Sequence, residues 1–162
     1  WAVAMISDTG ARLAEIIGAS VHDLDLDSDK APTLHIQPHS WRSLKTRSSN
    51  RTVPLVGAAL WGARRAVSNT QSTFLFTRYN KADLTNTNSA SAALSKWIKA
   101  EGRSDYTMHS FRHSFRDRLR AVKCPHDVID QLGGWSRQSV GESYGQGYGM
   151  SILAKWMRQI EV

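Results

Sequence analysis

The alternation of apolar and polar positions divides the chain into a helical beginning, a short β region and a longer helical remainder. Residues 1–18 read as helix with an interruption at residues 7–10, where Asp8 or Thr9 could cap the helix that follows. That second helix carries its apolar residues on one side and is predicted to end at Gly18.

Three short segments with alternating polarity predict the only β region, and they are residues 21–26, 33–37 and 51–53. Between the second and the third lies a polar, basic stretch, residues 40–50, which suits the tip of a hairpin. The pattern therefore predicts a small antiparallel sheet near the N-terminal end.

Helical periodicity returns after Pro54 and continues to the end of the chain. The predicted helices are residues 55–67, 88–100, 108–122, 125–132 and 151–160. Phe74-Leu75-Phe76 is a short buried run between the first two. We therefore expect one domain over residues 1–162, mainly α with a small antiparallel β-sheet, in the α+β class.

Charge narrows the range of partners. The 162 residues include 21 Lys and Arg against 14 Asp and Glu, a formal net charge of +7, which points to a polyanionic partner such as nucleic acid. Charge alone leaves a merely basic soluble enzyme equally open. No apolar run approaches the roughly 20 residues of a membrane span. The single cysteine excludes an internal disulfide and is compatible with a reducing compartment, so we expect a cytoplasmic protein.

Two isolated basic residues lie where an anion could be bound. Arg12 stands close to a predicted helix start, and a guanidinium there can present a planar fork of donors to a phosphate. Lys45 lies in the predicted hairpin tip. Taken alone, both are ordinary solvated charges, and Lys45 matters only if the tip folds over a site.

A stronger signal is the segment His109-Ser110-Phe111-Arg112-His113. On a helix, positions 109, 112 and 113 share one face, so a proton carrier and an anion binder converge within one turn. The two histidines also have the spacing of a zinc-binding helix. The metalloprotease form of that motif needs Glu directly after the first His, and Ser110 occupies this position.

The last stretch with possible chemistry is Leu132-Gly133-Gly134-Trp135, followed by Tyr144. A tyrosine hydroxyl has a free pKa of about 10 and needs activation by neighbouring groups before it can act as a nucleophile. In isolation, these residues indicate no more than a loop with a packing aromatic side chain and an ordinary tyrosine.

Together, however, these segments resemble the tyrosine recombinases of the phage integrase family. Residues 9–16 resemble the first arginine motif, Lys45 with residues 51–55 resembles the β-hairpin lysine and its strand, and residues 109–113 match His-x-x-Arg. Trp135 and Tyr144 match the third-box position and the nucleophile. The family most often has His at the third-box position, although some members have Trp, whose indole donates one hydrogen bond but cannot shuttle a proton.

The resemblance implies a catalytic site formed by Arg12, Lys45, His109, Arg112, Trp135 and Tyr144. The arginines would clamp the scissile phosphate, with Trp135 donating to one of its oxygens. Tyr144 would form a 3′-phosphotyrosyl bond, Lys45 would protonate the leaving 5′-oxygen, and His109 would take the tyrosine proton. His113 would give structural support. No metal and no cofactor are implied.

The resemblance also implies partners and context. Double-stranded DNA is the expected substrate, in integration, excision of a mobile element or dimer resolution, and an N-terminal core-binding domain is expected outside this chain. Further candidates for DNA-backbone contacts are Arg47, Arg51, Arg64, Arg65, Arg78 and Lys81. The C-terminal helix has an apolar stripe that either packs on its own domain or docks on a neighbouring protomer.

Two alternatives remain open at this point. A type IB topoisomerase-like enzyme would use the same residues without exchanging strands, and a non-catalytic DNA-binding module would share the fold alone. Within the nucleophile segment, the spacing from Trp135 favours Tyr144 over Tyr148.

Overall fold

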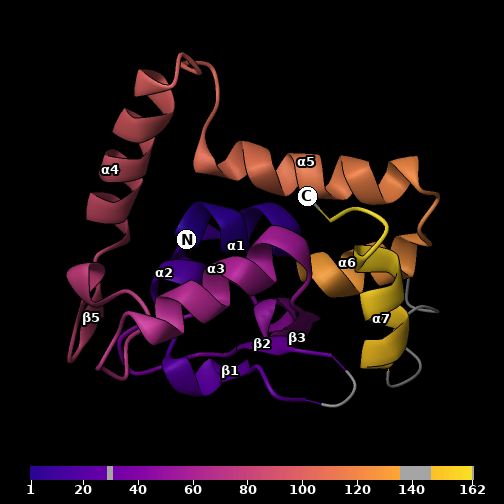
Figure 1. Ribbon diagram of the computed structural model, residues 1–162, viewed down its shortest axis with the longest axis horizontal. Coiled ribbons are helices and arrows are strands. Elements are labelled where there is room, and N and C mark those ends of the chain that lie inside the picture. Colours follow the sequence, from indigo (N-terminus) through magenta and orange to yellow (C-terminus); the bar gives the residue numbers. More distant parts are fainter. Residues whose placement is uncertain (29–30, 136–146, 162) are drawn as a thin grey trace.

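The computed structural model describes residues 1–28, 31–135 and 147–161, in which helices lie above and beside a small sheet (Figure 1). The helices are α1 (Ala2–Thr9), α2 (Leu13–Ile17), α3 (Gly57–Ser68), α4 (Thr87–Ala100), α5 (Met108–Ala121), α6 (His126–Gly133) and α7 (Met150–Met157). The strands are β1 (Leu24–Asp25), β2 (Thr33–Ile36), β3 (Arg51–Pro54), β4 (Asn80–Lys81) and β5 (Leu84–Thr85). The expected class, mainly α with a small antiparallel sheet, is confirmed.

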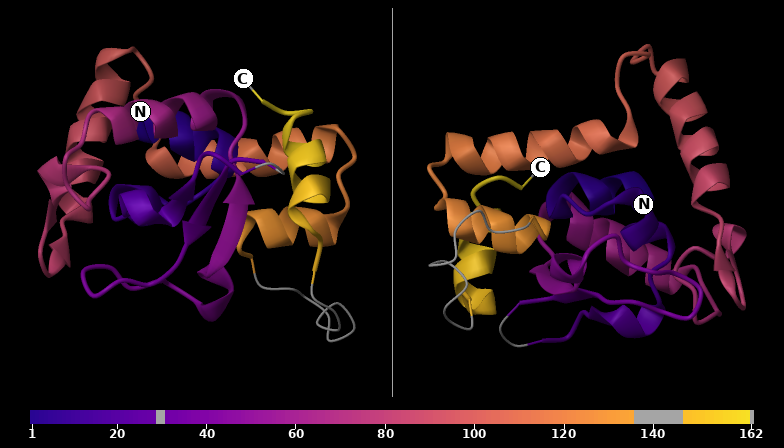
Figure 2. Two further views of the ribbon diagram at one scale, coloured as in Figure 1. Left: turned by 60° about the horizontal axis from the view of Figure 1, so that its bottom comes forward. Right: turned by 180° about the vertical axis from the view of Figure 1, so that it is seen from behind.

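Helix α1 lies at the centre of the domain, packed between α3 and α5 (Figures 1 and 2). Its Met5 and Ile6 are fully buried. The face of α3 toward α1 consists of small residues, among them Ala59 and Ala63, so the two helices can approach closely. Phe115 of α5 is also fully buried, and burial of each such large apolar side chain contributes about 1.5–3 kcal/mol.

The main sheet has the order β1-β2-β3, with both neighbouring pairs antiparallel. Leu34 pairs with Val53 across β2 and β3, and both are fully buried. His35, between two buried residues of β2, is exposed, as the alternation of side chains in a strand requires. Residues 37–50, which connect β2 to β3, include the predicted hairpin tip.

Two groups of elements flank this centre at opposite ends (Figure 1). Helices α6 and α7 pack against β3 at one end. Helix α4 stands at the other, above a second two-stranded sheet formed by β4 and β5, and Asn86 caps its first turn by accepting a hydrogen bond from Ser89 N at 2.9 Å. The sequence pattern had not predicted the β4–β5 sheet, because its strands have two residues each and show no periodicity.

The predicted strand over residues 21–26 is wrong in its first half. Residues Val21–Asp23 form a 3₁₀ turn, and only Leu24–Asp25 is a strand. Ser20 causes the difference: its Oγ accepts the His22 N–H at 3.1 Å, while its own N–H donates to Asp23 Oδ2 at 2.9 Å. These side chains satisfy the backbone locally and compete with strand pairing.

The helix break near the N-terminus also lies later than predicted. Residues 7–9 remain helical, and α1 ends at Thr9, followed by Gly10 as its C-cap in a left-handed conformation with φ 61°. Neither Asp8 nor Thr9 caps α2. Instead, Asp8 Oδ2 accepts a hydrogen bond from Ala58 N at 2.9 Å, at the start of α3, and Arg12 occupies the cap position of α2.

Candidate active site

Arg12 is held at the start of α2 by a carboxylate one turn later. Its backbone N–H donates to Glu15 Oε2 at 2.9 Å, and its Nη1 donates to Glu15 Oε1 at 2.7 Å and to Ser49 Oγ at 2.9 Å. The Glu15 side chain is 3% exposed, whereas that of Arg12 is 22% exposed. Glu15 and Ser49 thus orient a guanidinium that keeps one side open to an incoming anion.

Arg112 projects from the inner face of α5 and joins three segments. The residue is 2% exposed, and it donates hydrogen bonds from Nη1 to Gly10 O at 2.5 Å and from Nη2 to Gly133 O at 2.6 Å. Burial, followed by the positive charges of Arg12 and Arg51, lowers the pKa of Arg112 to about 10. Arg112 therefore remains charged at neutral pH, and the effect of Arg12 on its pKa indicates that the two guanidiniums are near each other.

Trp135 covers Arg112. The centre of its ring lies 4.2 Å from the guanidinium carbon of Arg112 and 4.9 Å from that of Arg116, which are cation–π distances. A Cβ on Gly133 would lie 1.7 Å from Trp135 Cζ3, so only glycine fits beneath the indole. The sequence Gly133-Gly134-Trp135 is therefore a packed helix end, and a Trp at the third-box position is fully accommodated.

His109 lies on the first turn of α5, one turn before Arg112. It lines a cavity of about 260 Å³ together with Arg12, and its ring meets that of His113 edge-on, with 4.9 Å between the centres. Partial burial lowers the pKa of His109, and the charges of His113, Arg112, Arg12 and Lys45 lower it further. The imidazole is consequently neutral at pH 7 and able to accept a proton.

The zinc alternative finds no further support in the geometry around His109 and His113. In the part of the chain that the structure describes, no three His, Cys, Asp or Glu side chains gather in a group that could hold a metal ion. The charged side chains that lower the pKa of His109, among them Arg112, Arg12 and Lys45, are cations. Cations repel a metal ion and attract a phosphate.

The tip between β2 and β3 folds against the site, which is the condition that gives Lys45 a role. Ser49 contacts Arg12, and Ser48 Oγ donates to Gly134 O at 3.5 Å, next to Trp135. Lys45 itself is exposed, and its positive charge contributes to lowering the pKa of His109. The segment that carries Lys45 therefore lies at the edge of the site, and the role of Lys45 itself stays a prediction.

Tyr144 lies outside the described residues, so its position relative to the arginines stays a prediction. Tyr148 is described and is fastened to α6. Its hydroxyl donates to Asp127 Oδ2 at 2.6 Å, its N–H donates to Gln131 Oε1 at 2.8 Å, and its carbonyl accepts a hydrogen bond from Gln131 Nε2 at 2.9 Å. The end of the segment that contains Tyr144 is therefore anchored on the helix that leads to Trp135.

Two site residues, Glu15 and Ser49, were missed by the sequence analysis. The spacing of three residues between Arg12 and Glu15 at a helix start is that of a capping box, and it could have identified Glu15. Ser49 has no comparable signal. Arg51 was one of six candidates for DNA-backbone contacts, and the structure places its side chain in the interior, with the residue 8% exposed.

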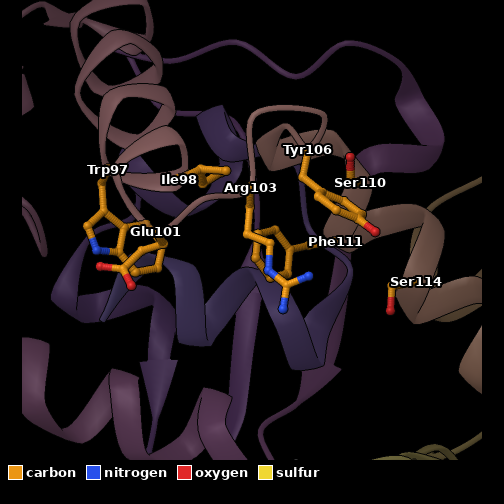
Figure 3. Close-up of a pocket in the computed structure, with 8 residues that line it drawn as sticks. All are labelled: Trp97, Ile98, Glu101, Arg103, Tyr106, Ser110, Phe111 and Ser114. Carbon is orange, nitrogen blue, oxygen red and sulfur yellow. The ribbon is translucent and has the colours of Figure 1, made fainter.

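An apolar cavity of about 320 Å³ lies on a different face of α5, toward the end of α4 (Figure 3). Trp97, Tyr106 and Phe111 are among the residues that line it. None of Arg12, Lys45, His109 and Arg112 does, so this cavity is separate from the candidate active site.

The pKa of His109 predicts the pH dependence of any proton transfer through it. A base works only when neutral, and a lowered pKa extends the neutral form to pH values below the usual 6.5. We expect the rate of a reaction step in which His109 accepts a proton to hold at pH 6.5 and to fall only at more acidic pH. In His109→Gln, most activity and this fall at acidic pH should both disappear. If the fall at acidic pH is unchanged in the variant, another group causes it.

The fold brings Arg12, Arg112 and His109 together, with the β2–β3 tip that carries Lys45 packed beside them. The chain belongs to the phage integrase family, whose model matches residues 1–148. A search of curated proteins found no match. None of the helices among the described residues is long and apolar enough to cross a membrane.

Solved structures with a similar fold are those of the integrase of the Tn1549 transposon. The one in complex with transposon right-end DNA has a TM-score of 0.66 and 18% sequence identity, and the match covers 97% of this chain and 57% of that chain. Another, in complex with circular intermediate DNA, has a TM-score of 0.63 and 19% identity, over 97% of this chain and 58% of that one. This chain thus spans less than two thirds of those chains.

Proposed function

We propose that this domain cuts and rejoins double-stranded DNA as the catalytic part of a site-specific recombinase of the integrase type. The observation that carries the proposal is the convergence of Arg12, Arg112 and neutral His109, with the tip that bears Lys45 folded against them. DNA in the solved relatives supports the same substrate class, since those integrases are bound to transposon DNA.

In the proposed reaction, the Tyr144 oxygen attacks phosphorus as His109 takes the hydroxyl proton. The bond from phosphorus to the 5′-oxygen breaks, and Lys45 protonates that oxygen. Arg12 and Arg112 stabilise the extra negative charge of the transition state, with Trp135 donating its indole N–H to a phosphate oxygen. Religation is the reverse sequence, so no bond energy is lost and neither metal nor nucleotide is required.

The decisive experiment is to trap the phosphotyrosyl adduct. A nicked suicide DNA loses its short 5′-hydroxyl product by diffusion, so the covalent complex accumulates and can be resolved on a denaturing gel. We expect an adduct with this chain in the presence of EDTA. DNA binding without any adduct would instead make the domain a non-catalytic binding module, and an adduct only without EDTA would restore a metal-dependent reaction.

The role of Lys45 can be separated from simple charge by changing the leaving group. A 5′-thiolate needs no general acid, so Lys45→Ala should cleave normal DNA slowly but 5′-thio DNA at nearly the rate of the unsubstituted chain. Lys81→Ala, which removes a charge from an exposed strand elsewhere, should show no such selectivity. If the thio substrate does not rescue Lys45→Ala, another group is the acid.

We also propose self-association on DNA through the C-terminal helix. In this chain α7 is folded back on its own domain: Leu153 and Met157 are fully buried, and Arg118 Nη1 donates to Ile160 O at 2.5 Å. Ile152 on the same helix is 43% exposed and is not used in this packing. Docking of α7 on a neighbouring protomer would bury this exposed side chain.

Ile152→Glu should therefore spare DNA binding and folding but weaken assembly of more than one protomer on a recombination site. The matched control is Ser151→Glu, which places the same charge at the preceding exposed position. The number of protomers on DNA can be counted by native mass measurement. Equal assembly by both variants would contradict docking through this helix. The apolar stripe of α7 would then serve only to pack the helix on its own domain.

A further inference from the structure

Arg51 is a buried cation at the point where three parts of the candidate site meet. Its side chain is 5% exposed. Nε donates to Leu132 O at 2.8 Å, Nη1 donates to Ser49 O at 2.8 Å, and Nη2 donates to Glu15 Oε2 at 3.1 Å. One planar guanidinium therefore connects the end of α6, the β2–β3 tip and the start of α2.

Two of these contacts lead directly to Arg12. Glu15, which accepts from Arg51, also accepts both the backbone N–H and the Nη1 of Arg12. The carbonyl of Ser49 accepts a hydrogen bond from Arg51, and its Oγ accepts one from the same Nη1 of Arg12 at 2.9 Å. Arg51 thus holds both partners that orient Arg12, without touching Arg12 itself by a hydrogen bond.

The charges of this cluster explain why a second arginine is needed. Burial alone would raise the pKa of Glu15, but Arg51 and the hydrogen bonds from Arg12 lower it, so Glu15 is a carboxylate. A buried carboxylate paired only with Arg12 would neutralise the guanidinium that has to bind phosphate. With Arg51 as the buried counter-ion, the cluster keeps a net positive charge on the more exposed Arg12.

The space around Arg51 is shaped for a guanidinium. Gly134 has φ +61°, and a Cβ there would lie 2.8 Å from Arg51 Nη1 and 2.9 Å from Ser48 O. The three acceptors require donors in a fixed planar arrangement, which the single ammonium of lysine cannot supply. Substitution by lysine would therefore keep the charge and lose at least part of the geometry.

We propose that Arg51 is a positioning residue for phosphate cleavage: it satisfies Glu15 and fixes Ser49, so that Arg12 is oriented and remains available to the scissile phosphate. The inference rests on the proposed function through the role assigned to Arg12. This positioning role differs from the DNA-backbone contact for which Arg51 was a candidate. Its effect is expected in the cleavage step, with DNA affinity almost unchanged.

A double-mutant cycle on single-turnover cleavage at saturating DNA tests the proposal. We expect Arg51→Lys to slow cleavage by on the order of 10- to 100-fold, as small displacements of a catalytic group do, with less than about threefold change in DNA affinity. In an Arg12→Ala background, followed long enough to resolve the slow rate, Arg51→Lys should cause little further loss, because its effect passes through Arg12.

The matched control is Arg42→Lys. Arg42 is also a buried arginine, 5% exposed, but it donates to backbone carbonyls, Glu15 O at 3.3 Å and Gln37 O at 2.5 Å. Arg42→Lys should lower the melting temperature while leaving the cleavage rate of the folded protein within about threefold. All rates are measured below the melting temperature of each variant, verified by circular dichroism.

The outcomes separate this inference from the function on which it rests. Full additivity of Arg51→Lys with Arg12→Ala overturns the positioning role, and so does a cleavage loss equal to that of Arg42→Lys. Normal cleavage by Arg12→Ala alone overturns the proposed role of Arg12 itself. If Arg51→Lys does not fold, Glu15→Gln replaces it in the cycle, and additivity there overturns the proposal equally, because Arg51 acts on Arg12 through Glu15.

Discussion

Tyr144→Phe is expected to abolish covalent attachment to DNA, because phenylalanine has no oxygen with which to attack phosphorus. The loss should be complete on nicked suicide DNA, whereas binding of the same DNA should be unchanged within about twofold, since one hydroxyl contributes little to a salt-dependent, charge-driven affinity. Adduct formation is measured on a denaturing gel, and binding is measured by anisotropy at fixed salt.

Tyr148→Phe is the matched control for this substitution. The Tyr148 hydroxyl already donates to Asp127 at 2.6 Å, an acceptor on α6 that holds it in a structural contact. Loss of this bond to a carboxylate should cost about 1.5–3 kcal/mol of stability and leave adduct formation intact. An adduct that persists in Tyr144→Phe and vanishes in Tyr148→Phe would show that the nucleophile has been assigned to the wrong tyrosine.

Arg112→Gln is expected to slow cleavage by at least about 10²-fold, as removal of a preorganised transition-state donor does. Because the pKa of Arg112 is lowered only to about 10, the side chain is charged throughout the neutral range, and the loss should be the same at pH 6.5 and pH 8. Single-turnover cleavage at saturating DNA measures the effect.

Arg116→Gln provides the control for Arg112. It lies on the same helix, its guanidinium carbon is 4.9 Å from the centre of the Trp135 ring, and it pairs with Asp130 at 3.6 Å. Because Arg112 also donates to Gly10 and Gly133, Arg112→Gln should lower the melting temperature as well, so both variants are compared while folded. Equal cleavage losses in the two variants would mean that Arg112 acts by packing.

The sequence predicted the elements well wherever apolar residues recur over several turns. Helices near the predicted positions of α4 and α5 are present to within a residue or two, since their amphipathic patterns extend over 14 residues each. The same pattern correctly placed His109 and Arg112 on neighbouring parts of one helix. Short elements were less predictable, as the turn at Val21–Asp23 shows, because one serine side chain can decide between turn and strand.

Recognition of the family from the sequence depended on the order of motifs and not on any single one. The match of the family model to residues 1–148 confirms it. The roles of Arg12, Lys45, His109, Arg112, Trp135 and Tyr144 stay predictions, and the described geometry shows which of these residues lie together. Tyr144 belongs to the undescribed part, so its placement depends on the spacing alone.

The amino-acid sequence by itself determined the longer helices, the basic character and the residues that could carry chemistry, because these depend on extended local patterns and on residue type. Only the tertiary structure decided which charged side chains are buried and which groups surround them. Nothing in the sequence pattern indicated that Arg51 and Arg112 are buried, yet Arg51 packs against Glu15 and Arg112 lies beneath Trp135. A buried arginine is stable only where acceptors from distant segments meet it, and that meeting exists only once the chain has folded.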